Sequence, residues 1–204
     1  MTRSFLVLLT FVMSTGVAAL AFETDGFRVV TSAGARQLSV ERAPPMMPDA
    51  RLVDQDGTPF TLSAYRGRAV LVDFIYTRCP TICGLLGDDF ANVLQLMKAT
   101  RLSTPIDLLS ISFDPQNDGR EALRLYGERF GAKAPRWRIA APSNKQELAG
   151  LLQSFGVVII PDGTGGFIHN DAVYVIDARG RLARILDPDP PAGLVDAGLE
   201  VAAQ

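Results

Sequence analysis

The sequence of 204 residues has few of the side chains that most often carry chemistry, with two cysteines and one histidine. These three residues are one ligand short of a closed structural zinc site. The chain also lacks an excess of positive charge, because 22 acidic residues outnumber 20 lysines and arginines and leave a formal net charge of −2. A nucleic-acid partner normally needs a basic face, so this charge argues against one. No fixed-period repeat or low-complexity tract is present, which argues against a repeat protein.

The N-terminal segment has the pattern of an export signal. Arg3 is followed by an apolar run that carries no charge before Glu23, and Ala19-Leu20-Ala21 forms an A-x-A cleavage pattern. We therefore expect residues 1–22 to be a signal peptide or a retained membrane anchor. The rest of the chain would then lie outside the cytoplasm, in the periplasm or on the inner membrane facing it. Thiols in that compartment face oxidation and need each other or a metal as a partner.

The remainder of the chain predicts one domain of the α/β class. Residues 23–45 are mixed and poorly periodic, which indicates a linker or lead-in, and residues 46–204 form the domain. Arg68 to Tyr76 and Ile106 to Phe113 are dense apolar runs typical of central strands that are covered on both faces. The sequence further predicts a hairpin at Asp56-Gly57, helices over 80–98, 119–130 and from an N-cap at Ser143, a strand at 157–160, a hairpin at 178–180 and a terminal helix. This alternation favours a three-layer sandwich with a mixed central sheet, and a thioredoxin-like topology fits it.

Both cysteines follow the first central strand, at Cys79 and Cys83. If a helix begins at Pro80, Cys79 is its N-cap and Cys83 lies one turn further on the same face. The positive end of the helix dipole stabilises thiolates there, and two clustered thiolates suit Cu(I) or Zn²⁺. The same spacing allows a disulfide. The short loop would contribute only about 2 kcal/mol, so a purely structural bridge is the weaker interpretation, while a redox couple and a metal clamp both stay open.

A third ligand is available in His169, which follows the glycine-rich turn 163–166 and precedes a predicted strand. In a thioredoxin-like layout this loop faces the start of the helix that carries the cysteines. Two thiolates and an imidazole suit Cu(I), and with one more donor Cu(II). Asp114 and Asp118 follow the second central strand and lie by topology at the same end of the sheet. Its place before Pro115 favours a turn or cap role for Asp114, and the alternative is an accessory residue that orients His169 or reaches the metal.

The chain resembles the SCO/SenC family of thioredoxin-like copper-binding proteins over about residues 46–187. The resemblance rests on DQDGTPFTLSAYRGRAVLVDFIYTRCPTIC, on SFDPQND and on the histidine in FIHNDAVYVID. It implies copper bound by Cys79, Cys83 and His169. It also implies delivery of copper to, or thiol reduction at, the copper A site of cytochrome c oxidase, and a tether to the inner membrane. Gly84 stands where the family commonly has proline, and Arg78 where a small, aromatic or histidine residue is frequent.

Two functions therefore compete. A copper metallochaperone would pass its cargo by ligand exchange to the copper-bearing oxidase subunit or another periplasmic copper protein, and needs no enzymatic activity. A thiol–disulfide oxidoreductase would use Cys79 as the attacking thiol and Cys83 as the resolving thiol, with a thioredoxin-like reductant as partner. The resemblance favours the metallochaperone. A peroxidase fits less well, because the residues that support a lone peroxidatic cysteine are not evident.

Overall fold

The computed structural model describes residues 3–23, 31–79, 82–100, 106–187 and 190–203, which fall into two compact units. The first unit, Met1–Ala43, contains helix α1 (Arg3–Glu23) and helix α2 (Ser32–Arg42). Within the described residues, no helix combines the length and the apolarity expected of a membrane span. Helix α2 lies inside the segment that we expected to be a linker. Its start is set by Thr31, whose side chain accepts a hydrogen bond from the Gly34 N–H at 3.1 Å, as an N-cap does.

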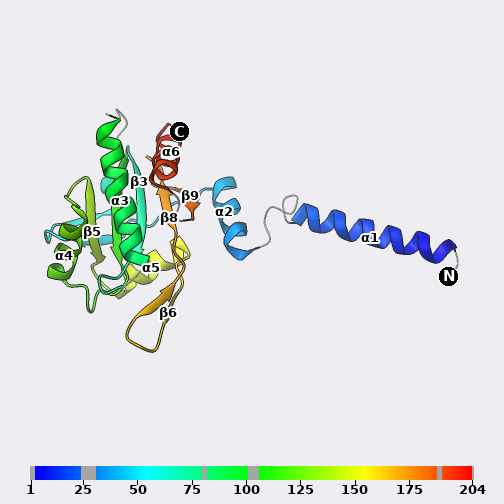
Figure 1. Cartoon of the computed structure of the whole chain (residues 1–204), viewed down its shortest axis with the longest axis horizontal. Coiled ribbons are helices and arrows are strands. Elements are labelled where there is room, and N and C mark those ends of the chain that lie inside the picture. The colour runs from blue at the N-terminus through cyan, green and yellow to red at the C-terminus, as the bar shows by residue number, and fades with distance from the viewer. Residues whose placement is uncertain (1–2, 24–30, 80–81, 101–105, 188–189, 204) are drawn as a thin grey trace. The chain divides into compact units, whose positions relative to one another are not determined.

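The second unit, Pro44–Gln204, is built on a seven-stranded sheet (Figure 1). Its strand order is β2-β1-β5-β4-β3-β8-β9. The strands are β1 (Arg51–Asp54), β2 (Pro59–Thr61), β3 (Ala69–Ile75), β4 (Ile106–Ser112), β5 (Trp137–Pro142), β8 (Val173–Ile176) and β9 (Leu182–Leu186). The central strands β3, β4 and β5 are parallel, and the outer pairings are antiparallel, so the sheet is mixed as predicted. Every residue of β3 and β4 is buried, which explains their unbroken apolar runs.

Helices cover both faces of this sheet. They are α3 (Ile82–Ala99), α4 (Arg120–Phe130), α5 (Lys145–Phe155) and α6 (Pro191–Ala202), with a short 3₁₀ helix η1 (Leu62–Tyr65). Phe90 of α3 packs against Trp137, whereas Phe155 of α5 packs against Phe74 and Tyr174 on the other face. The result is the predicted three-layer α/β sandwich, with α3 and α6 on one face and α5 on the opposite face.

Two local predictions needed correction. The N-cap of α5 is Asn144, whose side chain accepts a hydrogen bond from the Glu147 N–H at 2.9 Å, and not Ser143. The reason is that the Ser143 N–H bonds to the Arg51 carbonyl at 3.0 Å and so prolongs the strand pairing by one residue. The predicted strand at 157–160 is one arm of a separate hairpin, in which β6 (Ile159–Pro161) pairs antiparallel with β7 (Phe167–His169).

Candidate metal and thiol site

The first cysteine lies in the loop that leaves the central strand β3. The Cys79 N–H donates to the Tyr76 carbonyl at 3.1 Å, and Cys79 is half-buried. Helix α3 is described from Ile82, so Cys83 belongs to its first turn. Pro80, Thr81 and the side chain of Cys83 lie outside the described part of the chain. The expected helix start at Pro80, and the expected meeting of the two sulfurs on one face, therefore stay predictions.

A buried carboxylate fixes the start of the cysteine loop. Asp118 is 1% exposed and accepts hydrogen bonds from the Thr77 N–H at 2.9 Å and from the Thr77 hydroxyl at 2.6 Å. It also accepts from the Ser112 hydroxyl at 2.6 Å, at the end of β4. Hydrogen bonds to a charged acceptor are the stronger kind, so this carboxylate holds the loop firmly to the neighbouring strand.

The second expected carboxylate, Asp114, pairs with the arginine before the first cysteine. Its Oδ2 lies 2.9 Å from Nη2 of Arg78. Both of its carboxylate oxygens also accept from the Asn117 side-chain amide, at 3.0 and 2.9 Å, and its carbonyl accepts from the N–H groups of Asn117 and Asp118. Asp114 is thus a turn residue and a counter-ion at once. Its charge compensates much of the positive charge that Arg78 brings beside Cys79.

The single histidine ends strand β7 and is almost enclosed, with 5% of its side chain exposed. Its ring packs edge-on against Phe113, with centroids 4.9 Å apart, and against Tyr76 at 6.4 Å. Nδ1 of His169 lies 3.3 Å from Oδ1 of Asp171, and both atoms are buried without a hydrogen bond among the described residues. Burial raises the pKa of Asp171, and the nearby His169 acts in the opposite direction. The carboxylate against the histidine is therefore Asp171, which our sequence analysis did not consider.

Tyr76 links the cysteine loop to the histidine hairpin. Its carbonyl holds the Cys79 N–H, and its hydroxyl oxygen accepts the N–H of Phe167 at 3.4 Å. Its ring packs against Phe167 with centroids 5.3 Å apart and against His169. Two segments ninety residues apart in sequence are thus anchored on one residue at the end of β3. The only signal for Tyr76 in the sequence is its place at the end of that apolar run.

Metal-ligand geometry is not complete within the described side chains. Among them, no group of three histidine, cysteine, aspartate or glutamate residues is gathered in a way that could hold a metal ion. The side chain of Cys83, the third expected ligand, is outside that search. What the structure brings together is the loop of Cys79 and the ring of His169, around Tyr76.

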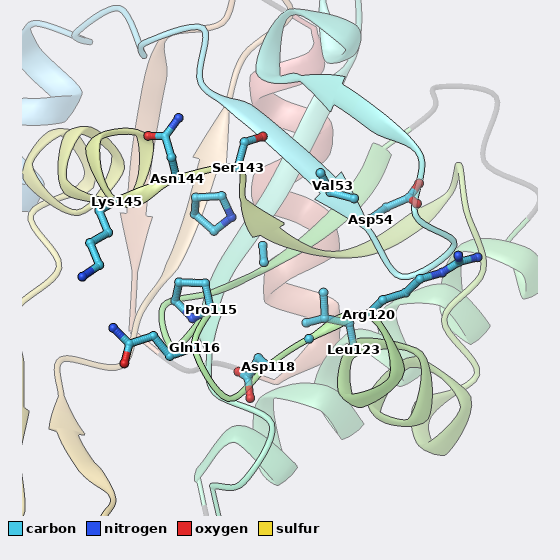
Figure 2. Close-up of a pocket in the computed structure, with 13 residues that line it drawn as sticks. Val53, Asp54, Pro115, Gln116, Asp118, Arg120, Leu123, Ser143, Asn144 and Lys145 are labelled. Atoms are coloured by element: carbon cyan, nitrogen blue, oxygen red, sulfur yellow. The ribbon is translucent and has the colours of Figure 1, made fainter.

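A cavity of about 390 Å³ lies beside Asp118, the carboxylate that holds the cysteine loop (Figure 2). Asp118 lines it together with Pro115 and Gln116, all three from the loop between β4 and α4. The first residues of α4 and α5 also border it. Neither Cys79 nor His169 contributes to its lining. Among the described residues, the cavity is therefore separate from Cys79 and His169, and Asp118 connects its lining to Thr77 of the cysteine loop.

Comparison with known proteins identifies relatives with this architecture. The SCO1/SenC family model matches residues 40–202. A SCO1 protein homolog of Bacillus subtilis is 26% identical over 133 residues, which cover 64% of this chain and 68% of that protein.

Solved structures give the same fold. A SCO1/SenC family lipoprotein of Bacillus anthracis has a TM-score of 0.69 at 22% identity, covering 79% of this chain and 98% of the other. ScoI of Arabidopsis thaliana, solved with copper bound, has a TM-score of 0.68 at 18% identity over 78% and 99% of the two chains. BsSco, a member of the Sco family of cytochrome c oxidase assembly proteins in which a disulfide switch was identified, has a TM-score of 0.67 at 20% identity over 79% and 90%.

Proposed function

Because the chain belongs to the SCO1/SenC family, we propose that it binds copper as cargo through the Cys79 and Cys83 thiolates and the His169 imidazole. The observation that carries the proposal is the anchoring of Cys79 and His169 on the same residue, Tyr76. Thiolate and imidazole are donors suited to copper, and a site with only three protein ligands leaves room for an incoming donor. Copper bound to the Arabidopsis ScoI structure supports this choice of metal.

Each element of the site has a part in holding and releasing the cargo. Asp118 and Asp114 hold the loop that presents Cys79. The Asp171 carboxylate beside Nδ1 of His169 favours the tautomer that leaves Nε2 for the metal, as outer-shell carboxylates commonly do. Cys79 is half-buried, so an incoming ligand of a partner protein can reach its sulfur. Copper would then pass by stepwise exchange of ligands.

We assign the client by family membership. BsSco belongs to the cytochrome c oxidase assembly proteins, which supports delivery of copper to, or thiol reduction at, the copper A site of the oxidase. Another exported copper protein is the alternative client. The lipoprotein relative of Bacillus anthracis and the signal-like residues 1–22 support an exported protein held at the membrane or free in the periplasm.

Thiol–disulfide exchange is the second candidate function. The half-buried position of Cys79 favours it, because an attacking thiol must be reached by its substrate. The disulfide switch of BsSco is a further reason to consider it. The two functions share the same dithiol, and they differ in their need for His169.

Copper titration of the reduced protein tests the proposal. We expect about one copper per chain for the wild type. His169→Ala should weaken copper binding by more than the roughly 10- to 100-fold loss typical of an outer-shell substitution, because a direct ligand is lost. Ile168→Ala is the matched control, since Ile168 is the adjacent residue and is 63% exposed. Unchanged affinity in His169→Ala would exclude the three-ligand site.

A further inference from the structure

The outer face of the β6–β7 hairpin is apolar and open to solvent. Ile160 of β6 and Ile168 of β7 are register partners, so their side chains lie on the same face of the hairpin. Val158 precedes Ile160 by two residues and shares this face. Val158, Ile160 and Ile168 are 58%, 55% and 63% exposed. These three residues form the hairpin face.

The opposite face of the same hairpin packs against the domain. The Phe167 ring lies 5.3 Å from the Tyr76 ring, and the His169 ring lies 4.9 Å from the Phe113 ring, measured between centroids. In an antiparallel pair with one packed face, the face toward solvent normally carries polar residues. The hairpin face breaks this pattern without adding to the core. Exposed apolar side chains that cluster, rather than scatter singly, are typical of interaction sites.

The hairpin presents this face in a fixed form. Its turn is closed by Asp162, whose Oδ1 accepts the N–H groups of Thr164 at 2.7 Å and of Gly166 at 2.9 Å. At the open end, the side chain of Asn170 accepts the Val158 N–H at 2.7 Å. A surface that is already held in its binding form loses little conformational entropy when a partner docks on it.

The hairpin face lies within reach of a protein that exchanges copper at His169. Ile168 directly precedes His169, and a strand of three residues is only about 10 Å long. A specific protein–protein contact covers about 800 Å² on each partner, which corresponds to a disc of roughly 16 Å radius. A contact centred on His169 therefore extends over the hairpin face. Figure 1 shows β6 projecting away from the sandwich, where a partner can reach it.

Charge and size favour a transient protein partner over a lipid surface or a second copy of this chain. Residues 157–172 carry two carboxylates, Asp162 and Asp171, and no lysine or arginine. Anionic membranes attract basic segments, so this hairpin has no electrostatic attraction to them. A stable interface buries about 20 to 30 residues on each partner. Three apolar side chains are too few for a stable dimer and suit a brief encounter.

We propose that the hairpin face is the docking surface for the protein that accepts the copper, and that this partner presents an apolar patch of neutral or basic charge beside its own copper ligands. The inference rests on the proposed function, because only a copper-loaded chain has cargo to deliver. Copper moves as Cu(I) without electron transfer: each bond to a ligand of the acceptor forms as a bond to a ligand of this chain breaks. The hairpin face makes no bond to copper and lengthens the time that the acceptor spends beside it.

The rates of copper transfer to a protein and to a small molecule separate docking from release. The protein probe is the soluble copper A domain of the cytochrome c oxidase from the same organism, prepared without metal. Its copper content is measured after rapid separation from the Cu(I)-loaded chain. The small-molecule probe is bathocuproine disulfonate, a Cu(I) chelator that needs no docking surface and whose copper complex is followed by absorbance.

Ile160→Thr and Ile168→Thr remove apolar surface and keep the β-branched shape that suits a strand. Each should raise the acceptor concentration for half-maximal transfer roughly tenfold, because burying the exposed part of an isoleucine changes affinity by about that factor. The limiting rate at saturating acceptor, and the rate of transfer to the chelator, should equal those of the wild type. Leu125→Thr is the matched control and should follow the wild type, since Leu125 lies on α4 and is 52% exposed.

The remaining outcomes are distinct. Wild-type half-saturation in both isoleucine variants would overturn the inference and leave the copper site, tested by His169→Ala, standing. It would equally be overturned if transfer stayed unchanged while the substitutions abolished either sedimentation with phosphatidylglycerol vesicles or a wild-type dimer in analytical ultracentrifugation. A wild type that binds copper but shows no saturable transfer would remove the oxidase as client and the inference with it. A wild type that binds no copper would refute the proposed function itself.

Discussion

Replacing Asp73 by asparagine should change how the stability of the protein depends on pH. Asp73 lies fully buried in the central strand β3, and this burial raises its pKa from 3.8 to about 7, while the Ser110 hydroxyl acts in the opposite direction. Between these values the folded chain holds a proton that the unfolded chain has released, so the free energy of unfolding falls as the pH rises and becomes level above pH 7. At 1.36 kcal/mol per pKa unit, the difference between the folded and unfolded pKa values corresponds to about 4 kcal/mol of stability. From pH 5 to pH 8 the wild type should lose about 3 kcal/mol through this group alone.

Urea unfolding of the reduced, metal-free proteins at pH 5 and pH 8 measures this term. Asparagine has the shape of aspartate and does not titrate, so Asp73→Asn should become more stable relative to the wild type by about 3 kcal/mol over this interval. With a slope of about 2 kcal/mol per molar urea, the relative midpoint should rise by roughly 1.5 M. Gln95→Ala, which changes an exposed, uncharged side chain of α3, should show a difference from the wild type that does not vary with pH. A pH-independent difference in stability between Asp73→Asn and the wild type would refute the raised pKa of this buried carboxyl.

Two further substitutions test the supports of the site. Asp118→Asn should lower the free energy of unfolding by about 3 kcal/mol in urea titrations, because it weakens three hydrogen bonds to a charged acceptor and leaves the donors of half-buried Thr77 and buried Ser112 poorly matched. A loss below 1 kcal/mol would show that the carboxylate does not hold the loop. Asp171→Asn should weaken copper binding by roughly 10- to 100-fold without changing copper stoichiometry, because it removes the charge beside Nδ1 of His169. Equal affinities of Asp171→Asn and wild type in a competitive copper titration would contradict that role.

The layers of the fold were predictable because they depend on local pattern. The two unbroken apolar runs became the fully buried parallel strands β3 and β4, since only a strand covered on both faces tolerates such a run. Asp56-Gly57 became a hairpin turn in which Gly57 adopts a φ of 81°, a conformation that favours glycine. Helix α2 was missed because it has little apolar face at helical spacing, with Val40 as its buried residue. A strand was predicted at 157–160, but its partner β7 was missed because it is only three residues long.

The sequence by itself determined the fold class, the family resemblance and the choice of Cys79, Cys83 and His169 as predicted ligands, because these follow from residue type, spacing and periodicity. Only the tertiary structure decided which side chains surround them. Tyr76 meets the histidine hairpin, and Asp118 meets Thr77, across long stretches of chain. The burial of Asp73 is likewise a property of packing, since a carboxyl in a strand is removed from water only when both faces of the sheet are covered. Such contacts, and the removal of these side chains from water, depend on three-dimensional proximity, which local sequence patterns do not encode.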